Sequence, residues 1–142
     1  IPPRSMNRLT IHIDGGARGN PGPAAIGVVF GSPLNKEYGE AIGSTTNNVA
    51  EYRALVFALK KAKQLLGKGQ AGETVIEIQS DSELVVKQQC GEYQVKEESL
   101  VPLFIEAWNL RQNFKSVVFV AIRREANFEA DALVNRALDT LL

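Results

Sequence analysis

Four acidic residues stand where strands and helices are expected to begin or end. Asp14 closes the apolar run "LTIHID" and Asp81 closes "TVIEIQSD", while Glu51 and Asp131 fall near the starts of two helical patterns. Sites in α/β proteins gather at strand ends, and acids drawn together there repel one another unless a cation lies among them. Oxygen ligands without Cys or His favour Mg²⁺ or Mn²⁺. Two such ions about 4 Å apart can activate a water and stabilise a leaving oxygen in phosphodiester hydrolysis.

Each acid also has a purely structural interpretation. Asp14 precedes two glycines and suits a turn, Glu51 and Asp131 suit the positive end of a helix dipole, and Asp81 suits a helix cap. For any one acid alone the structural interpretation is the better one, but it explains the conjunction of four poorly. Spacing alone therefore leaves both a metal site and a set of caps and turns open.

Composition narrows the class of protein. The chain has 142 residues, a length typical of one domain, and Lys+Arg and Asp+Glu are equal at 16 each. This balance weakens a nucleic-acid interpretation without excluding it. The single Cys90 excludes an internal disulfide, and with the single His12 it makes a Cys/His zinc site implausible. No apolar run approaches the roughly 18 residues that span a membrane, so no membrane segment is expected.

The elements that must position the acids follow from apolar spacing. Their predicted order is β-β-β-α-β-α-α-β-α, with Pro102 in the first turn of the third helix and Asn127 capping the last. Short links between the first three strands predict an antiparallel meander, and the later helices predict parallel pairs. We expect one domain over residues 6–142, preceded by an expression remnant over residues 1–5. The predicted strands are 9–14, 25–30, 36–43, 74–81 and 116–122, and the predicted helices are 50–66, 82–89, one from residue 100, and 129–142.

Four stretches together resemble one known family, ribonuclease H of type 1. They are "HIDGGARGNPGPAAIGVV", "TTNNVAEYRALVFAL", "IQSDSELVV" and "RREANFEADALVNRAL". The first two are the specific ones, because an Asp-Gly followed by Asn-Pro-Gly and then by Thr-Asn-Asn-x-x-Glu is hard to reach by chance. With the element order, the resemblance covers the chain from about Leu9 to its end.

The resemblance implies an α/β, ribonuclease H-like fold: a mixed five-stranded sheet, its first three strands antiparallel, with helices on both faces. It implies an endonuclease that hydrolyses the RNA strand of RNA–DNA hybrids without marked sequence specificity and leaves 3′-hydroxyl and 5′-phosphate ends. The implied cofactor is Mg²⁺ or Mn²⁺, two ions per site, and we expect a cytoplasmic monomer. The family's metal-binding and catalytic carboxylates match Asp14, Glu51, Asp81 and Asp131.

The same resemblance implies a set of substrate-contacting residues. Asn20, Asn47 and Asn48 match residues of the family that contact the minor groove of the hybrid, and Thr46 matches a residue of its DNA-phosphate pocket. Gly15 is expected to let the backbone approach the substrate. Side-chain amides can donate to and accept from the 2′-OH that distinguishes RNA from DNA. Turn and helix-cap chemistry remains an alternative for the asparagines.

The sequence departs from the family in two places. The segment "GEYQVKEES" stands where many members carry a basic handle, and Lys96 is its only base, so weak hybrid binding is expected. Many members also have a histidine before the fourth acid. Here that loop reads "RREANFE", and we expect Arg124 or Glu125 to take over part of its role. In the glycine-rich loop, Arg18 is the only charge available to a phosphate.

Three other classes of protein are alternatives to a hybrid nuclease. A transposase- or resolvase-like nuclease on the same fold is disfavoured by the Asn-Pro-Gly and Thr-Asn-Asn stretches. A hybrid-binding module with a decayed site is disfavoured by the presence of all four acids. A generic α/β domain would use the acids as caps and turn residues only.

Overall fold

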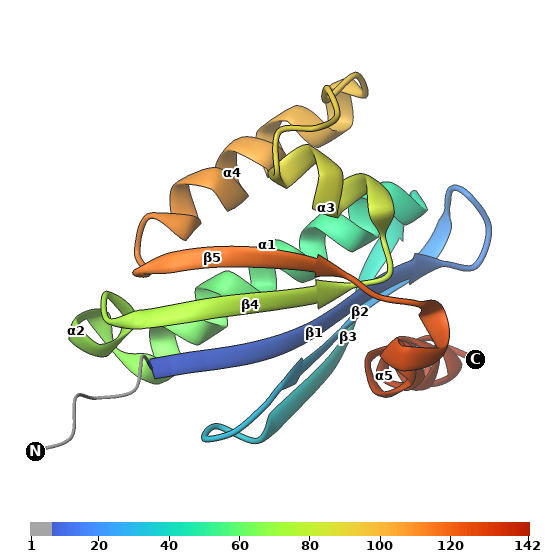
Figure 1. The fold of residues 1–142 in the computed structure, drawn as a ribbon. Helices are drawn as coiled ribbons and strands as arrows, with labels where there is room; N and C mark the ends of the chain where they lie inside the picture. Colours follow the sequence, from blue (N-terminus) through green and yellow to red (C-terminus); the bar gives the residue numbers. More distant parts are fainter. Residues whose placement is uncertain (1–6) are drawn as a thin grey trace, which may run out of the picture.

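The computed structural model describes residues 7–142, so the predicted expression remnant over residues 1–5 lies outside the described part. The strands and helices follow one another in nearly the predicted order (Figure 1). The strands are β1 (Asn7–Ala17), β2 (Gly22–Phe30), β3 (Lys36–Thr45), β4 (Thr74–Ser80) and β5 (Ser116–Ala121). The α-helices are α1 (Asn47–Leu66), α2 (Lys68–Ala71), α3 (Glu83–Gln89), α4 (Val101–Arg111) and α5 (Phe128–Asp139), with short 3₁₀ turns η1 (Glu98–Leu100) and η2 (Arg124–Asn127).

The five strands form one mixed sheet in the order β3-β2-β1-β4-β5. β2 runs antiparallel to β1 and β3, whereas β1, β4 and β5 run parallel. The register pairs Ile13 with Ser80 and Ser80 with Ala121. The three parallel strands therefore deliver Asp14, Asp81 and the chain after β5 to the same edge of the sheet. The predicted mixed sheet is confirmed.

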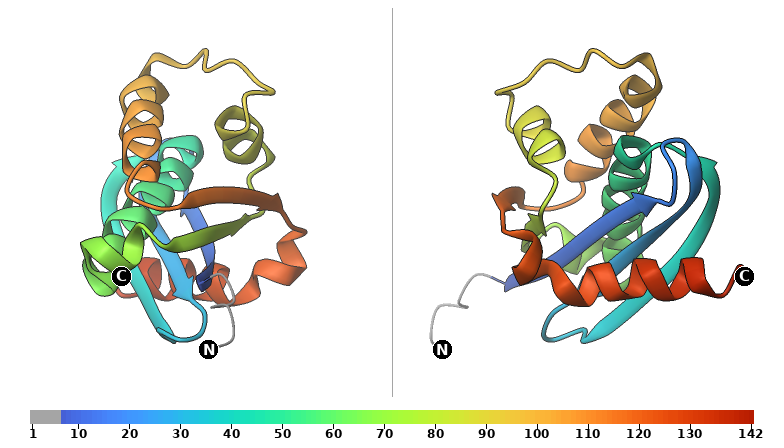
Figure 2. Two further views of the ribbon diagram at one scale, coloured as in Figure 1. Left: turned by 60° about the vertical axis from the view of Figure 1, so that its left-hand side comes forward. Right: turned by 90° about the vertical axis from the view of Figure 1, so that its right-hand side faces the viewer.

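Helices cover both faces of this sheet, as predicted. α1 packs on β1 and β2 and is itself covered by α4, while α5 lies alone on the opposite face over β2 and β3 (Figure 2). The core between α1 and the sheet is apolar and fully buried. It includes Ile11, Ile13, Ile78, Leu55 and Leu59. Within the described residues, no helix is both long enough and apolar enough to span a membrane.

Two glycines set how closely the helices approach the central strands. A Cβ on Gly15 of β1 would lie 2.3 Å from the backbone of Ala50 in α1. A Cβ on Gly27 of β2, the register partner of Asp14, would lie 2.2 Å from the Ala130 carbonyl oxygen in α5. Real Cβ atoms do not come this close to backbone atoms, so both positions require glycine. The two helices that carry Glu51 and Asp131 can thus lie against β1 and β2.

Element boundaries differ from the prediction in several places. β1 continues past Asp14 through both glycines to Ala17, so Asp14 lies inside the strand and does not end it. α1 begins at Asn47, because the Thr46 hydroxyl accepts the Val49 N–H at 3.2 Å and caps the helix. The short α2 and the two 3₁₀ turns were not predicted.

The start of α5 also differs in its chemistry. Asn127 occupies the cap position but makes no capping bond within the described chain. Its buried Nδ2 donates instead to the Ile13 carbonyl at 2.8 Å, which ties η2 to β1. α5 ends at Asp139, before the predicted end at residue 142, and Leu141 beyond it is 57% exposed. Trp108 of α4 is exposed as well.

Candidate active site

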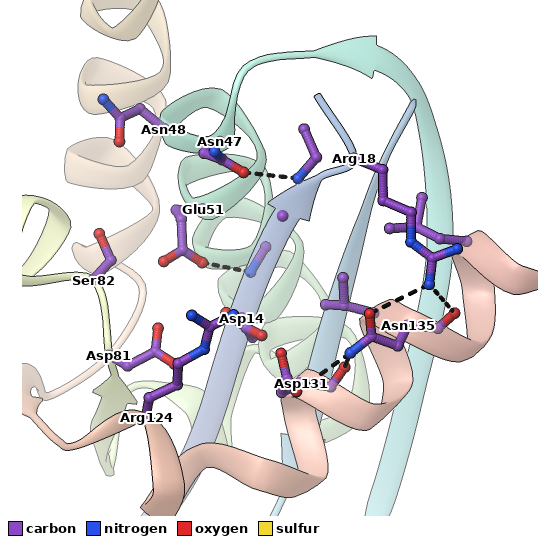
Figure 3. Close-up of a pocket in the computed structure, with 15 residues that line it drawn as sticks. Asp14, Arg18, Asn47, Asn48, Glu51, Asp81, Ser82, Arg124, Asp131 and Asn135 are labelled. Carbon is purple, nitrogen blue, oxygen red and sulfur yellow. Dashed lines mark hydrogen bonds between the residues drawn. The ribbon is translucent and has the colours of Figure 1, made fainter. Parts of the chain in front are cut away.

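Three of the four predicted acids meet at the carboxyl edge of the sheet. Asp14, Glu51 and Asp81 each offer a carboxylate oxygen, and these oxygens lie within 4.8 Å of one another. Asp131 is outside this group but lines the same cavity of about 410 Å³ (Figure 3). No Cys or His lines that cavity. A donor set of closely spaced carboxylates fits a hard divalent cation such as Mg²⁺ or Mn²⁺.

Two features of the fold place the three clustered acids. Asp14 and Asp81 come level because β1 and β4 are parallel and paired in register. Glu51 lies in the second turn of α1 and reaches the sheet because Gly15 lets α1 lie directly against β1. The Gly15 N–H donates to the Glu51 carboxylate and holds it toward Asp14. Gly15, predicted to approach the substrate, therefore has a structural reason that the sequence did not disclose.

Burial and mutual repulsion disfavour charge on these acids. Burial raises the pKa of Asp14 to about 7, and the charges of Asp81 and Asp131 add to the effect. Burial, followed by the charges of Asp14 and Asp81, raises the pKa of Glu51 well above its usual value. Burial also raises the pKa of Asp81, opposed by the Asn127 amide and the Arg124 charge. A bound divalent cation would reverse this balance by favouring the charged forms.

Asp131 is held on α5 by a neighbour that the sequence reading missed. Asn135, one turn later, donates from Nδ2 to the Asp131 carboxylate at 3.3 Å and to its carbonyl at 3.1 Å. Asn135 also lines the cavity. The i, i+4 spacing on an expected helix was the signal that could have found it.

The predicted substrate amides connect the glycine-rich loop to the start of α1. Asn20 Oδ1 accepts the Asn47 N–H at 3.0 Å, and Asn47 Oδ1 accepts the Ala17 N–H at 2.8 Å. Asn48 Nδ2 donates to Glu97 Oε1 at 2.8 Å. Asn47 and Asn48 line the cavity, whereas Asn20 does not. The oxygens of Asn20 and Asn47 thus serve the fold, and their NH₂ groups are the donors left for a ligand.

Of the two residues predicted to replace the histidine, only Arg124 reaches the site. It lines the cavity, and its guanidinium points toward Asp81 and Asp14 (Figure 3). Glu125 is exposed in η2 and is not part of the cavity wall. His12 is half-buried and lines a separate hollow together with Glu129, and this hollow contains none of the four candidate site acids. The histidine in β1 therefore does not face the carboxylates.

The segment between α3 and α4 arches above these two helices (Figure 2). It is tied to α1 through a buried chain of contacts. Tyr52 donates its hydroxyl to Gln88 Oε1 at 2.8 Å, and Gln88 Nε2 donates to the Gln94 carbonyl at 3.1 Å. The segment is thus anchored to α3 and, through Tyr52, to α1, even though it carries no cluster of bases.

Fold and site together define a class of α/β proteins with an acidic centre at the carboxyl edge of a mixed sheet. Comparison with known proteins is consistent with that class. The family described as "Reverse transcriptase-like" matches residues 12–137. A ribonuclease HI of Halobacterium salinarum is 38% identical over 142 residues, which are 98% of this chain and 68% of the relative. A bifunctional protein of Mycobacterium tuberculosis is 40% identical over 136 residues, and the match spans 36% of that relative.

Solved structures agree with the sequence relatives. The crystal structure of LC11-RNase H1 in complex with an RNA/DNA hybrid has 44% sequence identity and a TM-score of 0.87, covering 94% of this chain and 98% of that one. RNase H1 from Halobacterium salinarum has 38% identity and a TM-score of 0.85, covering 94% and 99%. The chain belongs to the type 1 ribonuclease H family.

Proposed function

We propose that this protein is a metal-dependent endonuclease that hydrolyses the RNA strand of RNA–DNA hybrids. The observation that carries the proposal is the group of three carboxylates at the carboxyl edge of the sheet. A family relative that binds an RNA/DNA hybrid supports the choice of substrate. The protein acts as a monomer in this proposal, and a cytoplasmic location stays a prediction.

The proposed metal ligands are Asp14, Glu51 and Asp81, with Asp131 completing the site from α5. Bound Mg²⁺ or Mn²⁺, two ions in our proposal, would lower the pKa of an attacking water and stabilise the leaving oxygen. The protein's own contribution is to hold buried carboxylates together at a cost that only a cation relieves. That cost favours cation binding over an empty, charged site.

The remaining groups bind and orient the hybrid. The NH₂ groups of Asn20 and Asn47 are donors for the shallow minor groove, where the RNA strand displays its 2′-OH. Asn48 is fixed by Glu97 with its Nδ2 committed, so its Oδ1 is the atom available to a donor such as a 2′-OH. Arg124 offers a positive charge beside Asp81, where a phosphate must approach. Gly15 and Thr46 contribute to the substrate surface in this proposal.

A panel of labelled nucleic acids tests the proposal. The expected result is Mg²⁺-dependent cleavage of the RNA in a hybrid and no cleavage of duplex DNA, duplex RNA or single-stranded RNA. Asp14→Asn and Asp81→Asn should each lower kcat by at least about 1000-fold while the circular dichroism spectrum stays unchanged. Glu40→Gln, an exposed acid on β3, is the matched control and should cleave normally. Cleavage of duplex DNA at a similar rate, or full activity in both Asn variants, would overturn the proposal.

A further inference from the structure

Arg18 lies at the mouth of the site with its charge turned toward α5. Its Nη2 forms an ion pair with Asp139 Oδ1 at 2.7 Å and long hydrogen bonds of 3.4 Å to the carbonyl and Oδ1 of Asn135. Arg18 lines the same cavity as the four acids (Figure 3). Its side chain keeps 42% of its surface exposed. The guanidinium therefore has donors free to face an incoming ligand.

The backbone that carries Arg18 is fixed on both sides. The Arg18 N–H donates to the Pro23 carbonyl at 2.8 Å, and the preceding Ala17 N–H donates to Asn47 Oδ1 at 2.8 Å. Asn20, two residues later, accepts the Asn47 N–H. The loop is thus anchored to β2 and to α1. A guanidinium on such a frame is positioned before any ligand arrives, which reduces the entropy lost on binding.

The charges around the cavity explain why a nucleic-acid ligand needs a basic side chain in the cavity wall. The acids alone would repel a nucleic-acid backbone, and the whole chain offers no basic excess, with 16 basic and 16 acidic residues. Arg18 and Arg124 are the two cations in the cavity wall, and they lie on opposite sides of Asp14 (Figure 3). Arginine suits this task because its planar fork matches two phosphate oxygens.

The contact with Asp139 is a weak one. The Asp139 side chain is 62% exposed, and exposed ion pairs contribute little to stability. A phosphate can therefore displace the Asp139 carboxylate from the guanidinium at little cost in free energy. The carboxylate nevertheless competes for the same donors and repels the phosphate. Removing that carboxylate should strengthen binding of a phosphate at Arg18, whereas removing Arg18 should weaken it.

We propose that Arg18 binds a backbone phosphate of the hybrid on the α5 side of the carboxylates, and that Asp139 competes with this phosphate for the guanidinium. The inference rests on the proposed function and adds to it a phosphate-binding residue with its own competitor. It also assigns a substrate contact to a chain whose α3–α4 segment carries Lys96 as its only base between Gly91 and Ser99.

Steady-state cleavage of a labelled hybrid in Mg²⁺ at low salt tests the pair. Arg18→Ala should raise KM about tenfold with kcat changed less than about twofold, because a ground-state contact is lost. The slope of log(kcat/KM) against log[salt] is negative, and Arg18→Ala should make it shallower by about 0.9, the effect of one lost phosphate contact. Asp139→Asn should lower KM about threefold, but have no effect in the Arg18→Ala background. Arg136→Ala removes an α5 charge outside the cavity wall and should change KM less than about twofold.

The outcomes separate this inference from its premise. A wild-type protein that cleaves no hybrid overturns the proposed function and the inference together. A wild type that cleaves, with KM and salt slope unchanged in Arg18→Ala, overturns the inference alone. If Asp139→Asn raises KM as Arg18→Ala does, the ion pair only holds the loop, and the competition is wrong. Urea unfolding of each variant, together with Arg18→Lys, separates a lost phosphate contact from a loosened loop, because Lys keeps the charge.

Discussion

Asp14 is the residue whose pKa reflects both the burial of the site and the repulsion among its acids. Burial raises its pKa from 3.8 to about 7, with further contributions from Asp81 and Asp131. At a pH between these two pKa values, the Asp14 carboxyl keeps its proton in the folded protein and releases it in the unfolded chain. The free energy of unfolding therefore falls as the pH rises from about 4 to about 7, and the loss is complete above pH 7. The metal-free fold bears this cost for a site that a cation can use.

Asp14→Asn should accordingly stabilise the metal-free protein. In EDTA at pH 8 we expect its free energy of unfolding to exceed that of the wild type by about 1–3 kcal/mol, because a buried charge has been removed. The difference should vanish near pH 4, where both forms are neutral at this position. Urea unfolding across this pH range measures it, with Glu40→Gln as the exposed control. A variant less stable than the wild type at pH 8 would contradict the assigned electrostatics.

At the scale of the elements, the site depends on how closely α1 approaches β1. Gly15 and Gly16 are neighbours in the same strand but face different surroundings. A Cβ at Gly15 would meet the backbone of Ala50 and Glu51 at 2.3–2.6 Å, whereas one at Gly16 would meet a Val134 methyl at 3.6 Å, an ordinary contact. Substituting each glycine in turn therefore tests how the fold depends on the distance between α1 and β1, with Gly16 as the control.

Gly15→Ala should lower the free energy of unfolding by about 3 kcal/mol, because α1 must shift to admit the methyl group. Gly16→Ala should change it by less than about 1 kcal/mol. Equilibrium urea unfolding measures both. Since the shift carries Glu51 away from Asp14, Gly15→Ala should also weaken Mg²⁺ binding measured by calorimetry. Equal stability of the two variants would show that α1 does not depend on Gly15 for its position.

Strand periodicity was sufficient to predict that Asp14 and Asp81 lie at one edge of the sheet. Asp14 and Asp81 follow apolar runs, and parallel pairing brings such positions together. The contribution of the helices was not predictable in the same way. The position of Glu51 next to Asp14 depends on the close approach of α1 to Gly15. The distance of Asp131 from the other three carboxylates depends on how α5 packs over Gly27. The contacts from Arg18 to Asp139 and from Asn48 to Glu97 join residues far apart in the sequence, so no local pattern announces them.

At the scale of the whole molecule, charge balance shapes how a polyanion can be held. The chain has no net charge, and four of its 16 acidic residues line the cavity together with Arg18 and Arg124. In the proposed function, hybrid binding therefore relies on a few positioned contacts and on the minor-groove amides more than on a broad basic surface. This arrangement fits an enzyme that reads the shape and the 2′-OH of a hybrid without reading its bases.

Mapping the cleavage products of one hybrid tests the proposed nuclease activity most directly. The RNA and DNA strands carry different end labels, and the wild-type protein is supplied with Mg²⁺. We expect cuts in the RNA strand alone, at many positions, with every new end a 3′-hydroxyl or a 5′-phosphate, because water attacks the phosphodiester. Cuts in the DNA strand, or RNA fragments ending in a 2′,3′-cyclic phosphate formed by attack of the 2′-OH, would contradict the proposed function.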